Sequence, residues 1–133
     1  MTTEDLANCI PSDKHDHAAV ARAAALGFPG LNPILGDLLE WIQDANWPIA
    51  PDIAALLTGA GPEIVPHISA ILRGTDGMWK YWTIELVVAQ SSDEIFQAMR
   101  PDLGRLSDHP TPDDRDCEAD LAARAALDTR PGL

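Results

Sequence analysis

Hydrophobic residues recur at spacings of three and four along nearly the whole chain. No window alternates apolar with polar residues for long enough to indicate a half-buried strand. Between residues 34 and 42 the apolar positions form one wide stripe, and Asp37 and Glu40 lie on the opposite side. Such a helix buries one face and exposes the other. The pattern therefore predicts an all-α protein.

Capping residues, prolines and glycines place the expected helix boundaries. Helices are expected over about 13–26, 32–45, 48–58, 62–74 and 78–89, from 92 or 93 onward, and over about 112–127. Asp13 or Ser12 can cap the first helix, and Gly27 stands at its expected end. The sixth helix must break or kink at Pro101, because proline removes a backbone donor and clashes with the preceding turn.

The last helix has the clearest start signal in the chain. Thr111 supplies an N-cap, Pro112 fits the first turn, and Asp114 is an acid at the capping-box position. We expect residues 129–133 to fray, since chain ends are poorly ordered unless they are held down. Residues 1–128 are then one helical domain.

An internal repeat organises the middle of the chain. Seven residues have counterparts 31 or 32 positions later: Asp44, Trp47, Leu56, Glu63, Ile64, Ile68 and Leu72 correspond to Asp76, Trp79, Val88, Glu94, Ile95, Met99 and Leu103. Each unit would be a helical hairpin. A unit this short cannot bury its apolar face alone, so neighbouring hairpins must stack side by side. The repeat predicts a short α-solenoid of about six to seven helices.

Four segments carry a family resemblance, in the same order along about nine-tenths of the chain. They are Ile10-Pro11-Ser12-Asp13-Lys14-His15-Asp16, Leu38-Leu39-Glu40-Trp41-Ile42-Gln43-Asp44-Ala45-Asn46-Trp47-Pro48, Trp79-Lys80-Tyr81-Trp82 and Pro110-Thr111-Pro112. These segments resemble a bacterial family of small, uncharacterised helical domains related to HEAT repeats. The resemblance implies a HEAT-like fold and brings no activity or catalytic residue. The surface of this chain departs from the family in being rich in Ala and Asp.

Composition excludes several classes of function. The 133 residues include 21 acids and 9 bases, which gives a net charge of −12. Nucleic acid needs clustered Lys and Arg, so it is not an expected partner. Two cysteines are too few for a disulfide scaffold. We expect a cytoplasmic protein, because the sequence shows neither a leader peptide nor a membrane-spanning segment. We also expect it to be a monomer or a weak homodimer.

Catalytic motifs are lacking. No nucleophile elbow or glycine-rich phosphate loop is present, so we expect no catalytic residue and no cofactor. Asp116 and Glu118 should raise the pKa of the Cys117 thiol. The one dense set of metal-ligand types is Asp13, His15, Asp16 and His17. Asp13 and His17 would share a helical face and could bind a divalent metal. The simpler interpretation is a helix N-terminus with favourable negative charge.

A partner-binding surface has more support. The repeat pairs Asp44 with Asp76 and Trp47 with Trp79, so two acids and two indoles should line one edge of the stack. The structural alternative is that the acids cap helices and the indoles pack between hairpins. Between Arg22 and Arg73 no Lys or Arg occurs, which leaves this region acidic. The candidate partner-binding residues are Asp37, Glu40, Asp44, Trp47, Asp76 and Trp79.

These observations favour a non-enzymatic protein-binding module. Its most concrete form is an acidic inhibitor or immunity-type protein that covers the basic active-site surface of a toxin enzyme. One alternative is a metal-dependent enzyme or metal-binding protein that uses the cluster from Asp13 to His17. Another is a structural subunit that associates with itself.

Overall fold

The computed structural model describes residues 3–130, and this part of the chain is helical without a strand. Its elements in order are α1 (Thr3–Ala7), α2 (His17–Leu26), η1 (Asn32–Ile34), α3 (Leu35–Leu39), η2 (Glu40–Ile42), α4 (Ala50–Leu57), η3 (Pro62–Ile64), α5 (Val65–Leu72), α6 (Gly77–Leu86), η4 (Val88–Gln90), α7 (Asp93–Asp108), α8 (Pro112–Asp116) and α9 (Ala119–Thr129). Elements labelled η are 3₁₀ helices. The all-α prediction is confirmed, although the described residues form more and shorter helices than expected.

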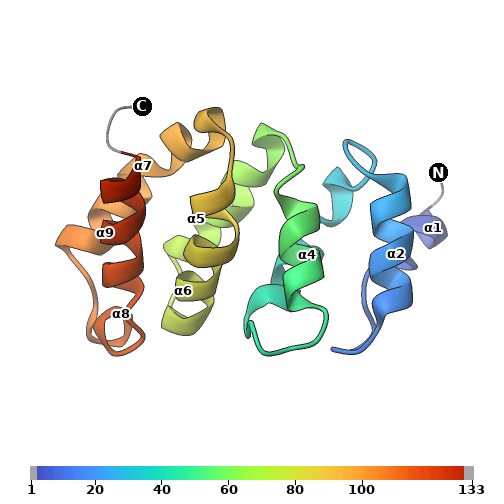
Figure 1. The fold of residues 1–133 in the computed structure, drawn as a ribbon, viewed down its shortest axis with the longest axis horizontal. Coiled ribbons are helices and arrows are strands. Elements are labelled where there is room, and N and C mark those ends of the chain that lie inside the picture. Colours follow the sequence, from blue (N-terminus) through green and yellow to red (C-terminus); the bar gives the residue numbers. More distant parts are fainter. Residues whose placement is uncertain (1–2, 131–133) are drawn as a thin grey trace.

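The helices lie in two rows, and α1 and α9 are at opposite ends of the molecule (Figure 1). One row contains α2, α4, α6 and α9, and each of these helices contacts the next. The other row contains α3, α5 and α7, which also contact one another in order. Contacts of α5 with α6 and of α7 with α9 join the rows. Each row is therefore held together by contacts between adjacent helices, which are not consecutive in the sequence.

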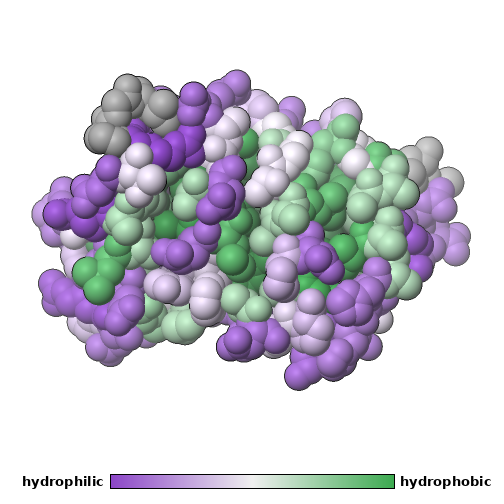
Figure 2. Space-filling model, in the orientation of Figure 1, coloured by the Kyte–Doolittle hydropathy of each residue, from purple (hydrophilic) through white to green (hydrophobic). Residues whose placement is uncertain are grey.

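One continuous hydrophobic core runs between the rows. Its largest fully buried side chains include Phe96, Leu38, Ile53, Ile68 and Leu72. Among the described residues, no helix is both long enough and apolar enough to cross a membrane. The outer face of α2 is rich in exposed alanines, and Figure 2 shows hydrophobic residues over α2 and α4. Hydrophilic residues dominate the same view around α8.

The first long helix begins later than expected. Asp16, not Ser12 or Asp13, caps α2, and its Oδ1 accepts a hydrogen bond from the Ala19 N–H at 3.1 Å. Its Oδ2 accepts from both the N–H and the hydroxyl of Ser12. The backbone hydrogen bonds from Ser12 and Ala19 hold the pKa of the Asp16 carboxyl below its ordinary value. The predicted end at Gly27 is confirmed, with a φ of 68° that glycine adopts without strain.

Two predicted helices are each divided. The helix expected over 32–45 is the series η1, α3 and η2, interrupted at Ile34, whose φ of −113° and ψ of 16° lie outside the helical range. The helix expected over 112–127 is divided into α8 and α9 by Glu118, which has a φ of 63°. The predicted capping box of α8, formed by Thr111 and Asp114, is confirmed.

A break or a kink is expected at Pro101, and the break is wrong, since α7 continues through that residue from Asp93 to Asp108. An interior proline costs about 3 kcal/mol. On both sides of Pro101 the helix buries large side chains, among them Phe96, Met99, Leu103 and Leu106. Burial of one such side chain contributes roughly 1.5–3 kcal/mol, so packing on both sides outweighs the lost backbone bond.

Charged side chains hold the helices of the C-terminal half together. Lys80 of α6 and Asp114 of α8 form an ion pair at 2.6 Å, and both side chains are almost fully buried. Asp102 of α7 is also buried, and it accepts hydrogen bonds from Ser69 of α5 and from Arg73, the residue after α5. These carboxylates link helices that are more than 28 residues apart in the sequence.

Residues 129–133 are expected to fray, and the structure describes the first two of them, Thr129 and Arg130. Thr129 ends α9. The guanidinium of Arg130 lies over the Phe96 ring, 4.3 Å from its centroid, and donates to the Ser91 carbonyl and the Asp93 carboxylate. Residues 131–133 lie outside the described residues.

Candidate functional site

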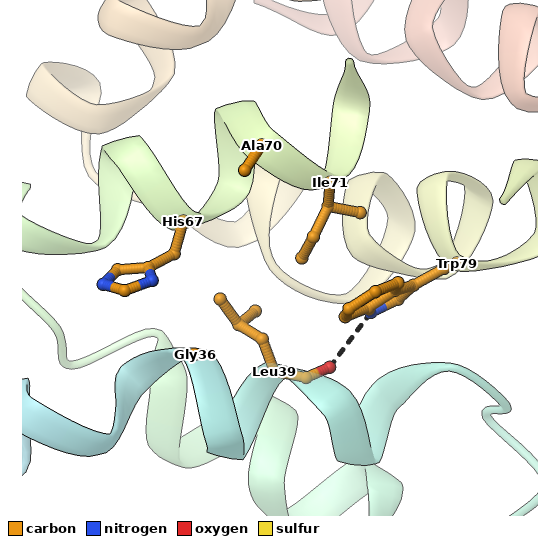
Figure 3. A pocket seen from close by; sticks show the side chains of 6 residues that line it. All are labelled: Gly36, Leu39, His67, Ala70, Ile71 and Trp79. Carbon is orange, nitrogen blue, oxygen red and sulfur yellow. Dashed lines mark hydrogen bonds between the residues drawn. The ribbon is translucent and has the colours of Figure 1, made fainter. Parts of the chain in front are cut away.

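A hollow of about 230 Å³ lies between α3, α5 and the start of α6 (Figure 3). It is lined by Gly36, Leu39, His67, Ala70, Ile71 and Trp79. The Trp79 indole closes one side and donates from Nε1 to the Leu39 carbonyl oxygen at 3.0 Å. We call this hollow the Trp79 pocket.

The sequence explains how the Trp79 pocket forms. A Cβ atom at Gly36 would approach the His67 Nδ1 to 3.3 Å, so the glycine leaves room for the His67 ring beside α3. Asp76 caps α6 by accepting from the Trp79 N–H at 3.0 Å, and this bond fixes where the tryptophan leaves the helix. Asp76 and Trp79 therefore act as the structural alternative predicts, one as a cap and the other as packing between helices.

A second hollow of about 240 Å³ lies beside η2. It is lined by Glu40, Trp41, Gln43 and Trp47, and we call it the tryptophan-pair hollow. The rings of Trp41 and Trp47 are 5.6 Å apart between centroids, with an interplanar angle of 58°. Both tryptophans are half-buried, whereas the Glu40 side chain is exposed. Two aromatic residues and an acidic residue thus line one concave surface.

A turn after η2 brings Trp47 back towards Trp41. Asp44 Oδ1 accepts from the Asn46 N–H at 2.8 Å, and the Trp47 N–H donates to the Asp44 carbonyl at 3.1 Å. This is the local side-chain turn that Asp favours. The Gln43 side-chain amide donates to the Glu40 carbonyl at 3.0 Å and closes the same segment. Asp44 therefore shapes the hollow, and it does not cap a helix as Asp76 does.

Three of the six candidate residues, Glu40, Trp47 and Trp79, line hollows on the two sides of one segment, residues 36–43. Leu39 lines the Trp79 pocket, and the next residue, Glu40, lines the tryptophan-pair hollow. Trp47 and Trp79 occupy different hollows and are not equivalent in their contacts. The expected single edge of two acids and two indoles is thus replaced by two adjacent hollows.

The acids on this segment stand apart from the bases. Asp37 and Glu40 are exposed, and within residues 3–130 neither forms an ion pair or a side-chain hydrogen bond. No arginine or lysine lies over a tryptophan ring in the same part of the chain. The segment therefore presents negative charge beside aromatic surface, and no cation of residues 3–130 pairs with it.

Sequence reasoning missed seven residues that line these hollows: Gly36, Leu39, Trp41, Gln43, His67, Ala70 and Ile71. Trp41 was assigned to a buried helical stripe, but the change from α3 to η2 leaves it half-buried against Trp47. One available signal was the pair of tryptophans six residues apart around a turn-forming Asp44-Ala45-Asn46 sequence.

The cluster from Asp13 to His17 is engaged in local structure. Asp13 lies before α2, so it does not share a helical face with His17, and its Oδ1 accepts from the His15 N–H at 2.8 Å. His17 Nδ1 faces Asp52 Oδ2 at 3.7 Å. In the described part of the chain, no group of three or more His, Cys, Asp or Glu side chains is placed to hold a metal ion.

The Cys117 thiol lies against α6. Burial raises its pKa above the ordinary value, and the charges of Asp113, Asp76 and Asp116 raise it further. The predicted direction is confirmed, although Glu118 is not among the causes.

Comparison with known families places the chain. A family model described as a domain of unknown function, DUF5071, matches residues 9–127. Because this match spans most of the chain, the chain belongs to that family. No curated protein matches it. The expected membership in a family of small uncharacterised domains is confirmed, and the relation to HEAT repeats stays a prediction.

Proposed function

We propose that the protein is a non-enzymatic protein-binding module whose partner docks on residues 36–47. The observation that carries this proposal is the pair of exposed carboxylates of Asp37 and Glu40, which form no ion pair within residues 3–130, beside two hollows lined by tryptophan. The most concrete version is an inhibitor or immunity-type protein that covers the basic active-site cleft of a toxin enzyme.

Electrostatics supports a basic partner. With a net charge of −12, the protein attracts a positive surface and speeds the encounter at low salt. The hollows add contact area, which charge alone does not provide, because tryptophan offers a large rigid surface at interfaces. Each hollow is smaller than the about 300 Å³ at which small-molecule pockets usually begin. Their volumes of about 230 and 240 Å³ suit single side chains of a protein partner.

We further interpret the two rows of helices as a short HEAT-like solenoid. Two consecutive units share one order of elements, α4-η3-α5 and α6-η4-α7. Their first helices contact each other, as do their second helices. Repeated pairs that contact mainly their neighbours are the defining feature of a solenoid. Such a scaffold would hold residues 36–47 on a rigid support.

The test is capture of the partner by charge variants. Tagged wild-type protein, the double variant Asp37→Lys with Glu40→Lys, and the control Asp116→Lys with Asp128→Lys are each incubated with a lysate of the organism that encodes the chain. The control changes the net charge by the same amount, because it also replaces two exposed acids by lysines, one in α8 and one in α9. Bound proteins are identified by mass spectrometry at about 50, 150 and 500 mM salt, a range over which charge screening strengthens markedly.

We expect wild type and control to capture one basic protein, with recovery falling as salt rises. The Asp37/Glu40 variant should recover little of it even at the lowest salt. Equal recovery by all three proteins would overturn the assignment to residues 36–47. Stable self-association without a foreign partner would favour a structural subunit instead.

A further inference from the structure

The tryptophan-pair hollow combines three chemical groups around one small space. The indoles of Trp41 and Trp47 supply aromatic surface, and Glu40 supplies a carboxylate. Gln43 adds an amide whose nitrogen already donates to the Glu40 carbonyl, which leaves its oxygen as an acceptor. The indole rings, the carboxylate and the amide oxygen of the residues that line the hollow can therefore each favour a cation or a hydrogen-bond donor.

The same chain shows how it holds a guanidinium elsewhere. Arg130 lies over the Phe96 ring at 4.3 Å, pairs with the Asp93 carboxylate at 2.5 Å, and donates to the Ser91 carbonyl at 2.8 Å. That arrangement has an aromatic face, a carboxylate and an amide-type oxygen. The tryptophan-pair hollow offers the same three groups, yet no base of the described chain enters it.

We propose that the tryptophan-pair hollow is a subsite for one arginine side chain of the protein partner. The inference rests on the proposed function and names the chemistry that the partner presents there. The guanidinium would lie against the indoles of Trp41 and Trp47. Its N–H groups would donate to the Glu40 carboxylate and to the Gln43 amide oxygen.

Arginine fits this hollow better than other occupants do. Its planar guanidinium stacks on aromatic faces and offers several donors in a fixed fork, which matches acceptors on two different side chains. Lysine has a compact, strongly hydrated charge without a plane to stack. An apolar side chain would bury the indoles but would leave the Glu40 carboxylate without a partner. A volume of about 240 Å³ matches one long side chain rather than a folded segment.

The test uses a single arginine as the probe and does not need the partner. N-acetyl-arginine amide is titrated into the full-length ¹⁵N-labelled protein at constant ionic strength, and the four indole N–H signals are followed by NMR. N-acetyl-citrulline amide is the neutral control of similar shape. N-acetyl-lysine amide has the same charge as the arginine compound but lacks the planar guanidinium. The variants are Glu40→Gln and, as a matched exposed acid on α7, Glu94→Gln.

We expect saturable shifts of the Trp41 and Trp47 indole signals with the arginine compound. Trp79 and Trp82 should not respond. Citrulline should give no saturable shift, and lysine should bind more weakly than arginine. Glu40→Gln should weaken arginine binding about tenfold, the order expected for the loss of one charge-assisted hydrogen bond. Glu94→Gln should bind as wild type does.

Three results would overturn the subsite. They are no saturable shift at Trp41 and Trp47, equal shifts with citrulline, or unchanged arginine binding by Glu40→Gln. Lysine binding as tight as arginine binding would overturn the assignment to a guanidinium. These outcomes are separate from the proposed function, because partner capture that depends on Asp37 and Glu40 can succeed even if arginine does not bind this hollow.

Discussion

Residues 36–47 and the block from α6 to α9 use their acids in opposite ways. In the C-terminal block, Asp114 and Asp102 are buried and bind bases from other helices. In the central segment, Asp37 and Glu40 are exposed and bind no base of the described chain. A count of acids along the sequence cannot distinguish these roles. The difference separates acids that hold the fold together from acids that remain available for a partner.

Tryptophans divide in a similar way. Trp79 donates its indole N–H to the Leu39 carbonyl and so joins α6 to α3. The Trp47 ring packs instead against another ring, that of Trp41, at the edge of a hollow. An indole whose N–H donates a hydrogen bond within the protein contributes mainly to the stability of the fold. The Trp41 and Trp47 pair is therefore the better candidate for contact with a partner.

The buried ion pair should give the largest effect on stability. Asp114→Asn keeps the shape of the side chain but leaves the Lys80 ammonium, 3% exposed, without its counter-charge. Removing one partner of a buried pair costs about 3–5 kcal/mol of unfolding free energy. Chemical denaturation followed by circular dichroism measures this loss.

A double variant tests whether the cost comes from the uncompensated charge. Lys80→Met with Asp114→Asn removes both charges and should be more stable than Asp114→Asn alone. If the double variant is as unstable as the single one, the loss stems from the capping box of α8 and not from the ion pair.

Asp102→Asn should have an intermediate effect. Its carboxylate accepts from Ser69 at 2.7 Å and from Arg73 at 2.8 Å. The Arg73 side chain is 66% exposed, so water can solvate it when the charge of Asp102 is lost. We expect a loss of about 1–3 kcal/mol, the range for buried hydrogen bonds to charged groups. If Asp102→Asn lowers the unfolding free energy as much as Asp114→Asn does, the exposure of the basic partner does not determine the size of the effect.

Acid should weaken the C-terminal block through Asp114. Burial alone would raise its pKa, but the hydrogen bond from Lys80, the hydrogen bonds at Thr111 and the Lys80 charge together hold the pKa below its ordinary value of about 3.9. A carboxyl with a lowered pKa stabilises the fold above the ordinary value, and this contribution is lost as the pH falls through the folded-state pKa.

The measurement is the difference in unfolding free energy between wild type and Asp114→Asn at several pH values. This difference should be largest near neutral pH and should shrink below about pH 4. A difference that stays constant down to the acid unfolding of the wild type would refute the role of the Asp114 charge.

The sequence predicts the helical class and several boundaries because these depend on local signals. The Thr111 and Asp114 capping box and the Gly27 stop are examples, since each rests on neighbours within a few residues. The pattern failed where distant contacts decide. Pro101 stays within α7 because packing on both sides holds the helix together. The division at Glu118 separates α8, which Lys80 of α6 holds, from α9.

The candidate surface was predictable only in part for the same reason. Local charge and tryptophan spacing identified Glu40, Trp47 and Trp79. The hollows themselves depend on which helices meet. His67 and Ile71 belong to the Trp79 pocket because α5 contacts α3, and no sequence period encodes that contact. Whether an acid is paired depends equally on distant bases, as Lys80 and Asp114 show, which are 34 positions apart in the sequence.

The smallest effect on stability should come from the central acids. The double variant Asp37→Asn with Glu40→Gln removes two exposed charges without a partner in the described chain, so unfolding free energy should change by less than about 0.5 kcal/mol. A small gain is reasonable, because like charges three residues apart on a helix repel each other by about 0.2–0.5 kcal/mol. Partner capture by the same variant should nevertheless fall sharply. A loss of stability above about 1 kcal/mol would mean that these acids also hold the fold together, and the distinction between the two regions would then disappear.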